Sequence, residues 1–529
     1  MSWRFFSFPR TSQAGRPWQE RLLGLTGWLV NAAGIVISAG WLIALFIAHL
    51  KVIAQPGPQE FNEPTIWRAT WLIDQGRNPY ALKELPASAY CFDPLYNYVL
   101  VALKPVFGID YTGHRLFNLV LLLASLALLV RVIQRAGAGL GIALLSAVFY
   151  YWMTLGNIMI TARPDLLGLF FFLLGILVPW ETNYDRWPTV FGLVCALVAF
   201  HCKSYYVLAA CATLLGMFLL RSKREAWWLG VGFLAVLGLS FAACEVLFPY
   251  YYVETVMVQR GAAALNSSDA ISMMHTLMLF DRGWPFLLMM GAGAGLWLWR
   301  REQARRTGAA VAPLLGGTAP GRDSRLLVLT VVFLIFLVLV YFYMGRNAGA
   351  FFTYHLHLLF PLMFVLAAYA AARPALRIAF GLLLAVFVQT YISVPGVPDS
   401  APAYRHLDQM IRNCPGEILG IASLTDIFDR LGRPVLHNGN TMYIPFAFEE
   451  GVAQSDPLII ALRDKFSRIE PEVMRKVAAR DYALVFTEFD EPYFCTKELL
   501  MANYDRVEQI DYFTYFGHSP IRVWRPKPR

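Results

Sequence analysis

The sequence predicts an α-helical polytopic membrane protein that carries a small α/β domain at its C-terminal end. Of its 529 residues, 57% are hydrophobic and only 15% are charged, whereas soluble domains carry about 25% charged residues. The apolar residues gather in runs near the roughly 20 residues that a helix needs to cross a bilayer. These runs stop near residue 395. We therefore expect a cytoplasmic N-terminus over 1–24, a membrane domain over 25–395 and a separate domain over 396–529.

The net charge of +9 does not indicate a nucleic-acid partner. The basic residues form short clusters between apolar runs, which is typical of the connections of a membrane protein and differs from a continuous basic stripe. The basic N-terminal residues precede an apolar run that has no small-residue cleavage site, which indicates a retained first span. Membrane lipids are therefore the surroundings that the composition predicts.

About eleven apolar segments are expected to span the membrane. Their ranges are 25–50, 114–133, 138–155, 165–181, 187–202, 204–220, 227–248, 283–299, 326–344, 354–371 and 377–394. A shorter apolar stretch bounded by prolines, 92–108, is expected to lie at the interface or dip into it. The Gly/Ala/Arg-rich segment 302–324 is expected to be a flexible inner loop.

Basic residues are distributed unevenly between alternate connections, which sets the expected orientation. One set of connections carries Arg131, Arg135, Arg186, Arg221, Lys223, Arg224, Arg300, Arg301, Arg305, Arg306, Arg322, Arg325, Arg373 and Arg377. The alternate short connections carry only Arg163, Lys203, Arg260, Arg282 and Arg346. This asymmetry predicts a cytoplasmic N-terminus and an extracytoplasmic first loop over 51–112. The odd number of spans places 396–529 on the same outer side.

The C-terminal segment alternates strand and helix signals. Strands are expected over 417–423, 433–437, 482–487, 507–515 and 521–524, and a helix over 425–431 that Gly432 closes. Cys414 and Cys495 lie in this domain, where the outer compartment permits a disulfide. The sequence leaves open whether the two residues pair or stay free thiols.

The first outer loop contains the polar residues that would suit a site at the membrane surface. Glu63, Asp74 and Asp93 supply carboxylates, and a Gly-Arg-Asn-Pro-Tyr turn runs from 76 to Tyr80 among several aromatic residues. Ionisable residues at membrane depth are costly, and they mark functional sites unless they are paired.

Further polar residues are expected at the same face. They are Arg163 and Asp165 in an Arg-Pro-Asp motif, His201 and Lys203 between two spans, and Arg346, Tyr354, His355 and His357 near a late span. Cations that face one outer cavity, opposite carboxylates, suit an anionic lipid phosphate. A carboxylate could deprotonate an acceptor hydroxyl while Arg, Lys or a divalent ion stabilises the departing phosphate.

Each of these residues also has a structural interpretation. In that interpretation Arg163 and Asp165 pair with each other or cap a helix, Lys203 extends to the headgroups, and Asp74 is solvated. Glu63 precedes a proline and suits the first turn of a helix. The loop aromatics form an interfacial belt. His355 and His357 are two residues apart, so on a helix they face different sides, which disfavours a shared metal.

The order of these motifs resembles bacterial members of the GT-C glycosyltransferase superfamily, in particular the mannosyl, aminoarabinose and galacturonosyl transferase-like group. Those proteins begin with one span and an outer loop with an Asp-Glu motif, a Gly-x-x-Pro-Tyr turn and a Pro-Pro-Leu-Tyr-like step. Here Asn62-Glu63, Gly76 to Tyr80 and 93–96 stand in these places. The Arg-Pro-Asp motif, Lys203 and the segment 345–355 follow in the family's order. The chain departs from the pattern because Asn62 replaces one carboxylate and Asp93 replaces a proline.

The resemblance implies an inverting sugar transfer from a polyprenyl-phosphate donor to a lipid, glycan or protein acceptor on the outer face of a bacterial inner membrane. It implies Glu63 as general base. Donor phosphate binding falls to Arg163, Lys203, Arg346 and His355, and Asp74, Asp93, Asp165, Tyr80 and Tyr354 would orient the sugar or a metal. A divalent cation is left open, with Glu63 and Asp93 as its ligands if one is used.

Two other functions would use the same outer residues differently. A transporter or flippase of a lipid-linked sugar would be expected to show matching halves with broken helices, which the sequence does not show. A scaffold would not need Glu63, Arg163 and Lys203 on one side. The enzyme interpretation predicts that these three residues line one cavity open to the outside and to lipid.

Overall fold

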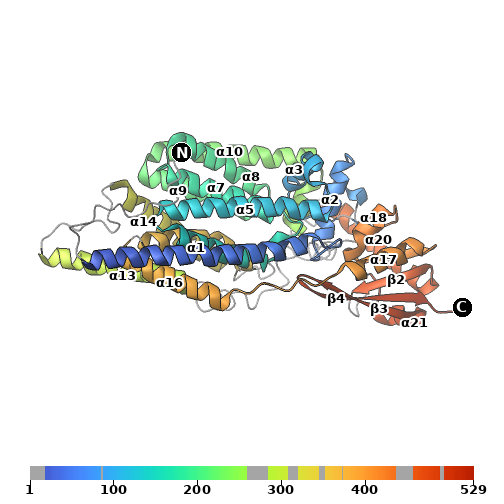
Figure 1. The fold of residues 1–529 in the computed structure, drawn as a ribbon. Helices are drawn as coiled ribbons and strands as arrows, with labels where there is room; N and C mark the ends of the chain where they lie inside the picture. Colours follow the sequence, from blue (N-terminus) through green and yellow to red (C-terminus); the bar gives the residue numbers. More distant parts are fainter. Residues whose placement is uncertain are drawn as a thin grey trace.

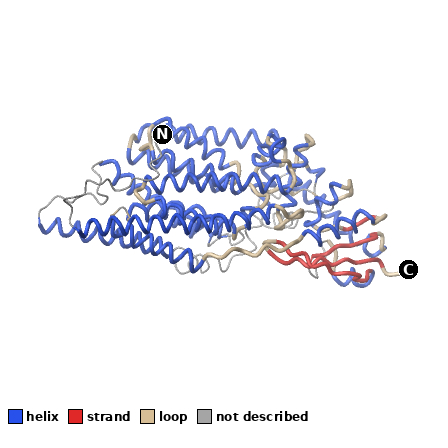
Figure 2. Tube along the Cα trace, in the orientation of Figure 1, coloured by secondary structure: helices blue, strands red, loops and turns tan. Residues whose placement is uncertain are grey.

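The computed structural model describes residues 18–84, 87, 89–258, 284–307, 320–344, 352–371, 373–435, 457–488 and 494–528. A long helical bundle carries a mixed domain at one end (Figure 1). Among the described residues, the strands lie in that terminal domain (Figure 2). The division into a helical part and a small α/β part is therefore the one that the sequence predicts.

Each predicted span coincides with a helix. The helices are α1 (Trp18–Ile53), α5 (Tyr111–Arg135), α6 (Leu140–Leu155), α7 (Asp165–Glu181), α8 (Arg186–Phe200), α9 (Leu208–Leu220), α10 (Lys223–Leu247), α13 (Trp284–Thr307), α14 (Pro320–Met344), α15 (Phe352–Ala370) and α16 (Pro374–Tyr391). Within the described chain, four are long and apolar enough to cross a membrane, namely α1, α5, α10 and α16. Eleven spans therefore remain a prediction.

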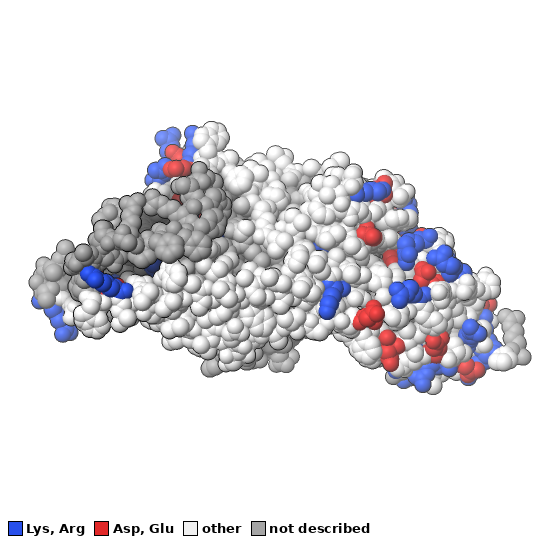
Figure 3. Space-filling view, in the orientation of Figure 1, with Lys and Arg blue, Asp and Glu red and all other residues white. Residues whose placement is uncertain are grey.

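The surface of the bundle suits a bilayer. Helix α10 exposes large apolar side chains along its length, and Val246 is 80% exposed. On the face seen in Figure 3, charged side chains gather mainly toward the two ends of the molecule, with a nearly uncharged stretch between them. Inside the bundle, α1 and α6 approach closely at Gly34 and Gly141, where a Cβ on Gly34 would lie 3.1 Å from the Gly141 backbone. Small residues allow this approach because helices in lipid associate through close packing.

The first loop folds into short helices over the end of the bundle. Helix α2 (Glu63–Asp74) begins at Glu63 with a proline in its first turn. It ends at Asp74, two residues before Gly76, whose positive φ of 68° suits a residue without a Cβ. The predicted turn to Tyr80 follows, with the Tyr80 amide bound to the Asn78 side chain (2.9 Å). The short helix η1 (Leu82–Glu84) comes next.

The apolar stretch 92–108 is split into two short helices. These are α3 (Leu95–Ala102) and α4 (Lys104–Phe107), which has a proline in its first turn. Gly108 ends α4 with a φ of 77°. Val106 is 75% exposed, as an interfacial helix would require.

The C-terminal domain is built on a sheet of β1 (Glu417–Leu419), β2 (Tyr482–Glu488), β3 (Tyr504–Thr514) and β4 (Gly517–Pro526) in the order β1-β2-β4-β3. Strand β1 pairs with β2 in parallel, and the other pairs are antiparallel. Helices α17 (Ala401–Asn413), α18 (Thr425–Arg430), α20 (Pro457–Ala479) and α21 (Lys497–Asn503) accompany the sheet. Helix α18 ends before Gly432, which has the left-handed φ of 65° that a helix C-terminus favours.

One strand prediction was wrong where it can be examined. Residues 433–435 of the expected strand 433–437 have no strand conformation, and the rest lies outside the described residues. The Arg433 amide and guanidinium instead bond backbone carbonyls, at Phe428 (2.9 Å) and Gly416 (3.0 Å).

The two cysteines of this domain are free thiols. Cys414 packs into the core on one face of the sheet, with Leu484 and Phe486 of β2. Cys495 packs against the core that contains Val485, the residue between Leu484 and Phe486 on the same strand. Because alternate residues of a strand point to opposite faces, the sheet separates the two sulfur atoms.

The first loop and the C-terminal domain lie at the same end of the bundle, as the odd number of spans predicts (Figure 1). Arg68 of α2 forms an ion pair with Asp429 of α18, and each side chain is 7% exposed. The Tyr512 hydroxyl donates to the carbonyl of Pro58 (3.0 Å). The domain therefore holds the loop from outside the bundle.

Candidate active site

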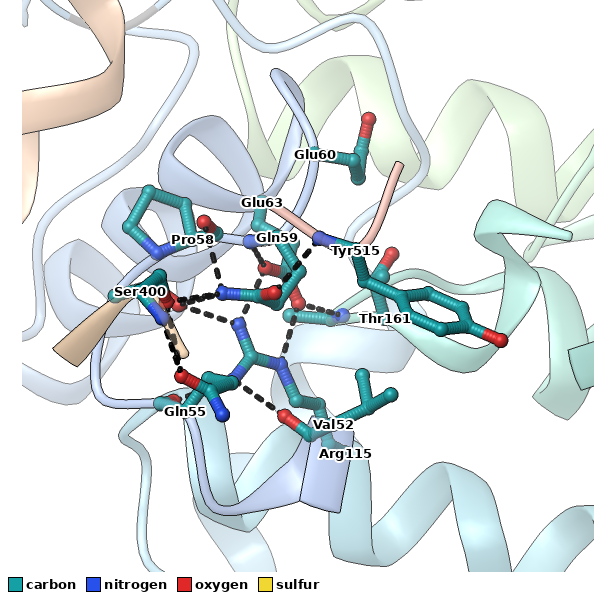
Figure 4. A network of polar contacts seen from close by, with 12 residues as sticks. Val52, Gln55, Pro58, Gln59, Glu60, Glu63, Arg115, Thr161, Ser400 and Tyr515 are labelled. Atoms are coloured by element: carbon teal, nitrogen blue, oxygen red, sulfur yellow. Dashed lines mark hydrogen bonds and ion pairs between the residues drawn. The ribbon is translucent and has the colours of Figure 1, made fainter. Parts of the chain in front are cut away.

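Glu63 lies in a fully buried ion pair with Arg115 of α5, and both side chains have 0% exposure. Arg115 donates from Nε to Oε1 (2.9 Å) and from Nη2 to Oε2 (2.6 Å). The amide of Ala162 donates to Oε1 (2.7 Å), and the amide of Gln59 donates to Oε2. Figure 4 shows this carboxylate enclosed by its donors. Each carboxylate oxygen thus accepts two hydrogen bonds.

Arg115 is not among the site residues predicted from the sequence. A signal was present, because an arginine at the start of an apolar run is costly unless it is paired. Arg115 also donates to the carbonyls of Gln55 (2.7 Å) and Gly57 (2.8 Å). It therefore ties the chain between α1 and α2 to the bundle.

The C-terminal domain completes this network through Gln59 (Figure 4). The Gln59 side chain donates to the Ser400 hydroxyl (3.1 Å) and accepts from the Tyr515 amide (2.9 Å). The Ser400 amide in turn donates to Gln55 Oε1 (3.0 Å). Residues far apart in the sequence thus position the loop that precedes α2.

A second buried network gathers the cations that the sequence predicts. Arg163 Nε lies 3.0 Å from Asp165 Oδ2, and Lys203 Nζ forms an ion pair with the other oxygen of Asp165. Arg163 also donates from Nη1 to Glu60 Oε1 (2.9 Å). The Asp165 side chain is fully buried, and that of Lys203 is 12% exposed. Arg163 and Asp165 do pair, and Lys203 turns into the protein rather than toward headgroups.

The two networks adjoin along the chain, because Ala162 binds Glu63 and the next residue, Arg163, binds Glu60. Glu63, Arg163 and Lys203 therefore lie near one another, and Arg163 and Lys203 share Asp165. The side chains of Glu63 and Arg163 are buried, and that of Lys203 is 12% exposed. That the three residues line one cavity open to the outside and to lipid stays a prediction.

Phe92 and Asp93 extend the second network toward Tyr251 and His201. The Phe92 ring centroid lies 5.4 Å from Arg163 Cζ and 5.9 Å from Lys203 Nζ, within the range of a cation–π contact. Asp93 accepts a hydrogen bond from the Tyr251 hydroxyl, and its Oδ1 lies 3.6 Å from His201 Nδ1.

His201 also lines a cavity of about 800 Å³. Its walls are mostly apolar and come from α10 and the loop helices, including Leu95, Tyr98, Leu247 and Phe248. Leu247 is 68% exposed, so this side of the cavity belongs to the apolar surface. The volume falls in the range of about 300–1,000 Å³ that is common for ligand sites.

The other predicted residues are placed as follows. Asp74 forms an ion pair with Lys104 (2.7 Å) rather than standing solvated. Tyr80 is buried and its hydroxyl donates to the Phe92 carbonyl (2.6 Å). Tyr354 and His355 lie at the start of α15, and only their backbone is described, while Arg346 lies outside the described residues. The functional roles of all these residues stay predictions.

His357 belongs to the interior of the bundle. Its side chain is fully buried, and Nε2 lies 3.1 Å from the Thr154 hydroxyl. The Tyr150 hydroxyl donates to the His357 carbonyl (3.2 Å). These contacts give His357 a packing role between α6 and α15.

A divalent cation held by Glu63 and Asp93 does not fit the described residues. A carboxylate has about four acceptor positions, and those of Glu63 are filled by protein donors. The described part of the chain also contains no group of three or more His, Cys, Asp or Glu side chains arranged to hold a metal ion. We therefore assign no step to a metal.

Comparison with known proteins gives structural likenesses only. No family model matches the chain, and no curated protein sequence matches it. The chain is similar to ArnT from Cupriavidus metallidurans in the apo state, with 13% identity, a TM-score of 0.43, and coverage of 96% of this chain and 100% of that one. For the same protein bound to undecaprenyl phosphate the values are 14%, 0.42, 94% and 98%.

The oligosaccharyltransferase of Archaeoglobus fulgidus tethered with an acceptor peptide is also similar, with 12% identity, a TM-score of 0.41, and coverage of 90% of this chain and 74% of that one. All three TM-scores lie below 0.5.

Proposed function

We propose that this protein is an inverting glycosyltransferase that moves a sugar from a polyprenyl-phosphate donor to an acceptor at the outer face of the membrane. The observation that carries the proposal is the buried cluster of Arg163, Asp165 and Lys203 at one end of an apolar bundle. Buried charges at membrane depth are costly unless they are used or paired. Here two cations share one carboxylate beside a cavity that faces the bilayer.

The reaction needs positive charge at this place. When the bond between the sugar and the phosphate breaks, the departing phosphate gains a negative charge, and fixed cations stabilise that charge best in a site that excludes water. Arg163 offers a planar guanidinium that suits phosphate oxygens. Lys203, the more exposed of the two cations, can exchange Asp165 for a phosphate oxygen. Arg346 and His355 remain proposed additional phosphate ligands.

The cavity lined by His201 suits the prenyl chain of the donor. Its lining is mostly apolar, and its wall formed by α10 is part of the lipid-facing surface. Asp93 joins it to the cationic cluster, because Asp93 lies beside His201 and directly follows Phe92, whose ring contacts both cations. A lipid in this cavity would therefore bring its phosphate to the cluster. The sugar would lie toward the outer loop, with its acceptor on a lipid, glycan or protein.

The test is transfer of radiolabelled sugar from polyprenyl-phosphate donors in proteoliposomes. We expect Lys203→Gln to raise the donor KM by at least about tenfold, because one of the two cations of the cluster that bind the phosphate is lost. Arg412→Gln is the matched control, since it removes a cation whose side chain is 57% exposed on the C-terminal domain. Equal donor KM values in all three proteins would refute the phosphate site.

The same proteoliposomes distinguish a transferase from a transporter. A transporter would carry the labelled lipid from one leaflet to the other and leave the bond between sugar and phosphate intact. Movement of intact donor without any transfer product would replace the enzyme proposal with the transporter.

A further inference from the structure

Glu60 is a buried carboxylate with an unused acceptor oxygen. Its side chain is 1% exposed, and Oε1 accepts from Arg163 Nη1 (2.9 Å). Within the described residues, Oε2 is buried and has no hydrogen-bond partner. Unpaired buried oxygens are uncommon and each needs an explanation. In Figure 4 the Glu60 carboxylate points away from the pair formed by Glu63 and Arg115.

Glu63, three residues after Glu60, has no unused acceptor position. Its four acceptor positions are filled by Arg115, which donates twice, and by the amides of Gln59 and Ala162. A substrate hydroxyl could bind Glu63 only after one of these donors had left. The side chains of Glu63 and Arg115, at the centre of this network, both have 0% exposure.

We propose that Glu60, and not Glu63, accepts the proton of the acceptor hydroxyl, and that the pair of Glu63 and Arg115 positions the loop that carries Glu60. The inference rests on the proposed transferase function. It places the proton acceptor and the phosphate-binding cations in one cluster, because Arg163 binds Glu60 and shares Asp165 with Lys203. The sequence motif predicts Glu63 as the general base, whereas the contacts favour Glu60.

The step balances within this site. The acceptor hydroxyl gives its proton to Glu60 Oε2 while its oxygen forms a bond to the anomeric carbon of the sugar. The bond between that carbon and the phosphate oxygen breaks, and the phosphate keeps the electron pair. The products are the glycosylated acceptor, polyprenyl phosphate and a protonated Glu60, which returns its proton to water.

The surroundings of Glu60 make its carboxylate a better proton acceptor than a carboxylate in water. Burial raises the pKa of the Glu60 carboxyl above its usual value, and the nearby charge of Glu63 acts in the same direction. Arg163 and the Asn62 amide lower the pKa and offset part of this rise. A base is most effective when its pKa approaches the working pH. The contact with Arg163 keeps the carboxylate ionised and oriented.

The experiment compares Glu60→Gln with Glu63→Gln in the full-length protein. For each protein we would measure binding of radiolabelled polyprenyl-phosphate sugar to purified protein and transfer in proteoliposomes. Glutamine keeps the shape of Glu60 and still offers an oxygen to Arg163, but it cannot take a proton at neutral pH. We expect Glu60→Gln to bind the donor within about threefold of wild type and to lose at least about 100-fold in transfer rate.

The pH dependence of kcat/KM adds a measurement that would not change if Glu60 had only a structural role. Wild-type kcat/KM should fall as the pH drops through the raised pKa of Glu60, and any residual activity of Glu60→Gln should lack that fall. Glu60→Asp gives a second variant if Glu60→Gln does not fold. Asp keeps the charge, but its side chain is one methylene shorter, which moves the carboxylate oxygens away from the acceptor hydroxyl. The transfer rate should therefore fall at least about tenfold while donor binding stays unchanged.

The outcomes separate the inference from the proposed function. Transfer by Glu60→Gln or Glu60→Asp at the wild-type rate would overturn the role of Glu60 and leave the transferase intact. Loss of transfer in folded Glu63→Gln, beside an active Glu60→Gln, would return the base to Glu63. Absence of transfer by the wild type with every donor would overturn the transferase and, with it, the role of Glu60.

Discussion

Replacing Arg115 by Met should destabilise the protein by about 3–5 kcal/mol, because it leaves the carboxylate of Glu63 buried without its partner. Both side chains have 0% exposure. Two of the four hydrogen bonds to Glu63 come from Arg115. The substitution also removes the donors of the Gln55 and Gly57 carbonyls. Met keeps an unbranched apolar stem like that of Arg and lacks the guanidinium, so the main losses are the charge and its hydrogen bonds.

A double-mutant cycle separates the ion pair from these other losses. Glu63→Gln alone leaves the charge of Arg115 buried, and the double variant removes both charges. Contacting residues couple by about 0.5–3 kcal/mol. We therefore expect the double variant to be more stable than the sum of the single effects by at least about 1 kcal/mol. Denaturant unfolding in detergent micelles, followed by tryptophan fluorescence, would give the free energies.

Arg131→Met is the matched control for this cycle. Arg131 pairs with Glu181 but is 46% exposed, and exposed ion pairs contribute about 0–1 kcal/mol. A loss for Arg115→Met no larger than the loss for Arg131→Met would refute the argument that the buried pair fixes the loop.

Three further predictions concern the C-terminal domain. Arg68→Met should release this domain from the loop and raise its protease sensitivity, because the ion pair with Asp429 is nearly buried; unchanged digestion would contradict this. Burial raises the pKa of Asp426 to about 6 in the folded protein. The protonated Asp426 therefore stabilises the fold fully below the unfolded pKa near 3.8, and this stabilisation is lost as the pH rises through about 6. Asp426→Asn should therefore weaken the pH dependence of unfolding in that window, and an unchanged dependence would count against the assignment. Cys414 and Cys495 should both react with a thiol reagent in denatured, unreduced protein, whereas resistance would indicate a disulfide.

The helices of the bundle could be predicted because the hydrophobicity of each segment determines them. A run of apolar residues in lipid must satisfy its backbone internally, and a helix does so. Each predicted span therefore coincides with a helix, including α7, which begins at Asp165 as expected. The break at Leu103 and the loss of a strand at Arg433 depend on a local proline and on individual hydrogen bonds. A pattern of hydrophobicity does not contain these details.

The site was predictable only in part, because its pairs join residues far apart in the sequence. The Arg-Pro-Asp motif and Lys203 pointed to a cluster, and the structure brings both cations onto Asp165. The partner of Glu63 lies 52 residues away on α5. Nothing in the local sequence distinguishes the environment of Glu60 from that of Glu63. Both are acidic residues near the start of α2, and only the tertiary contacts separate them.

The difference between these two carboxylates follows from what each task requires. A side chain that fixes a loop is most effective when every acceptor position is filled by a rigid donor, as for Glu63. A proton acceptor needs a free oxygen and a pKa above the usual value of a carboxyl, as for Glu60. One carboxylate cannot meet both requirements, because the donors that hold it also stabilise its charged form. The loop therefore divides the two tasks between residues three positions apart, and the rigid one holds the reactive one against Arg163.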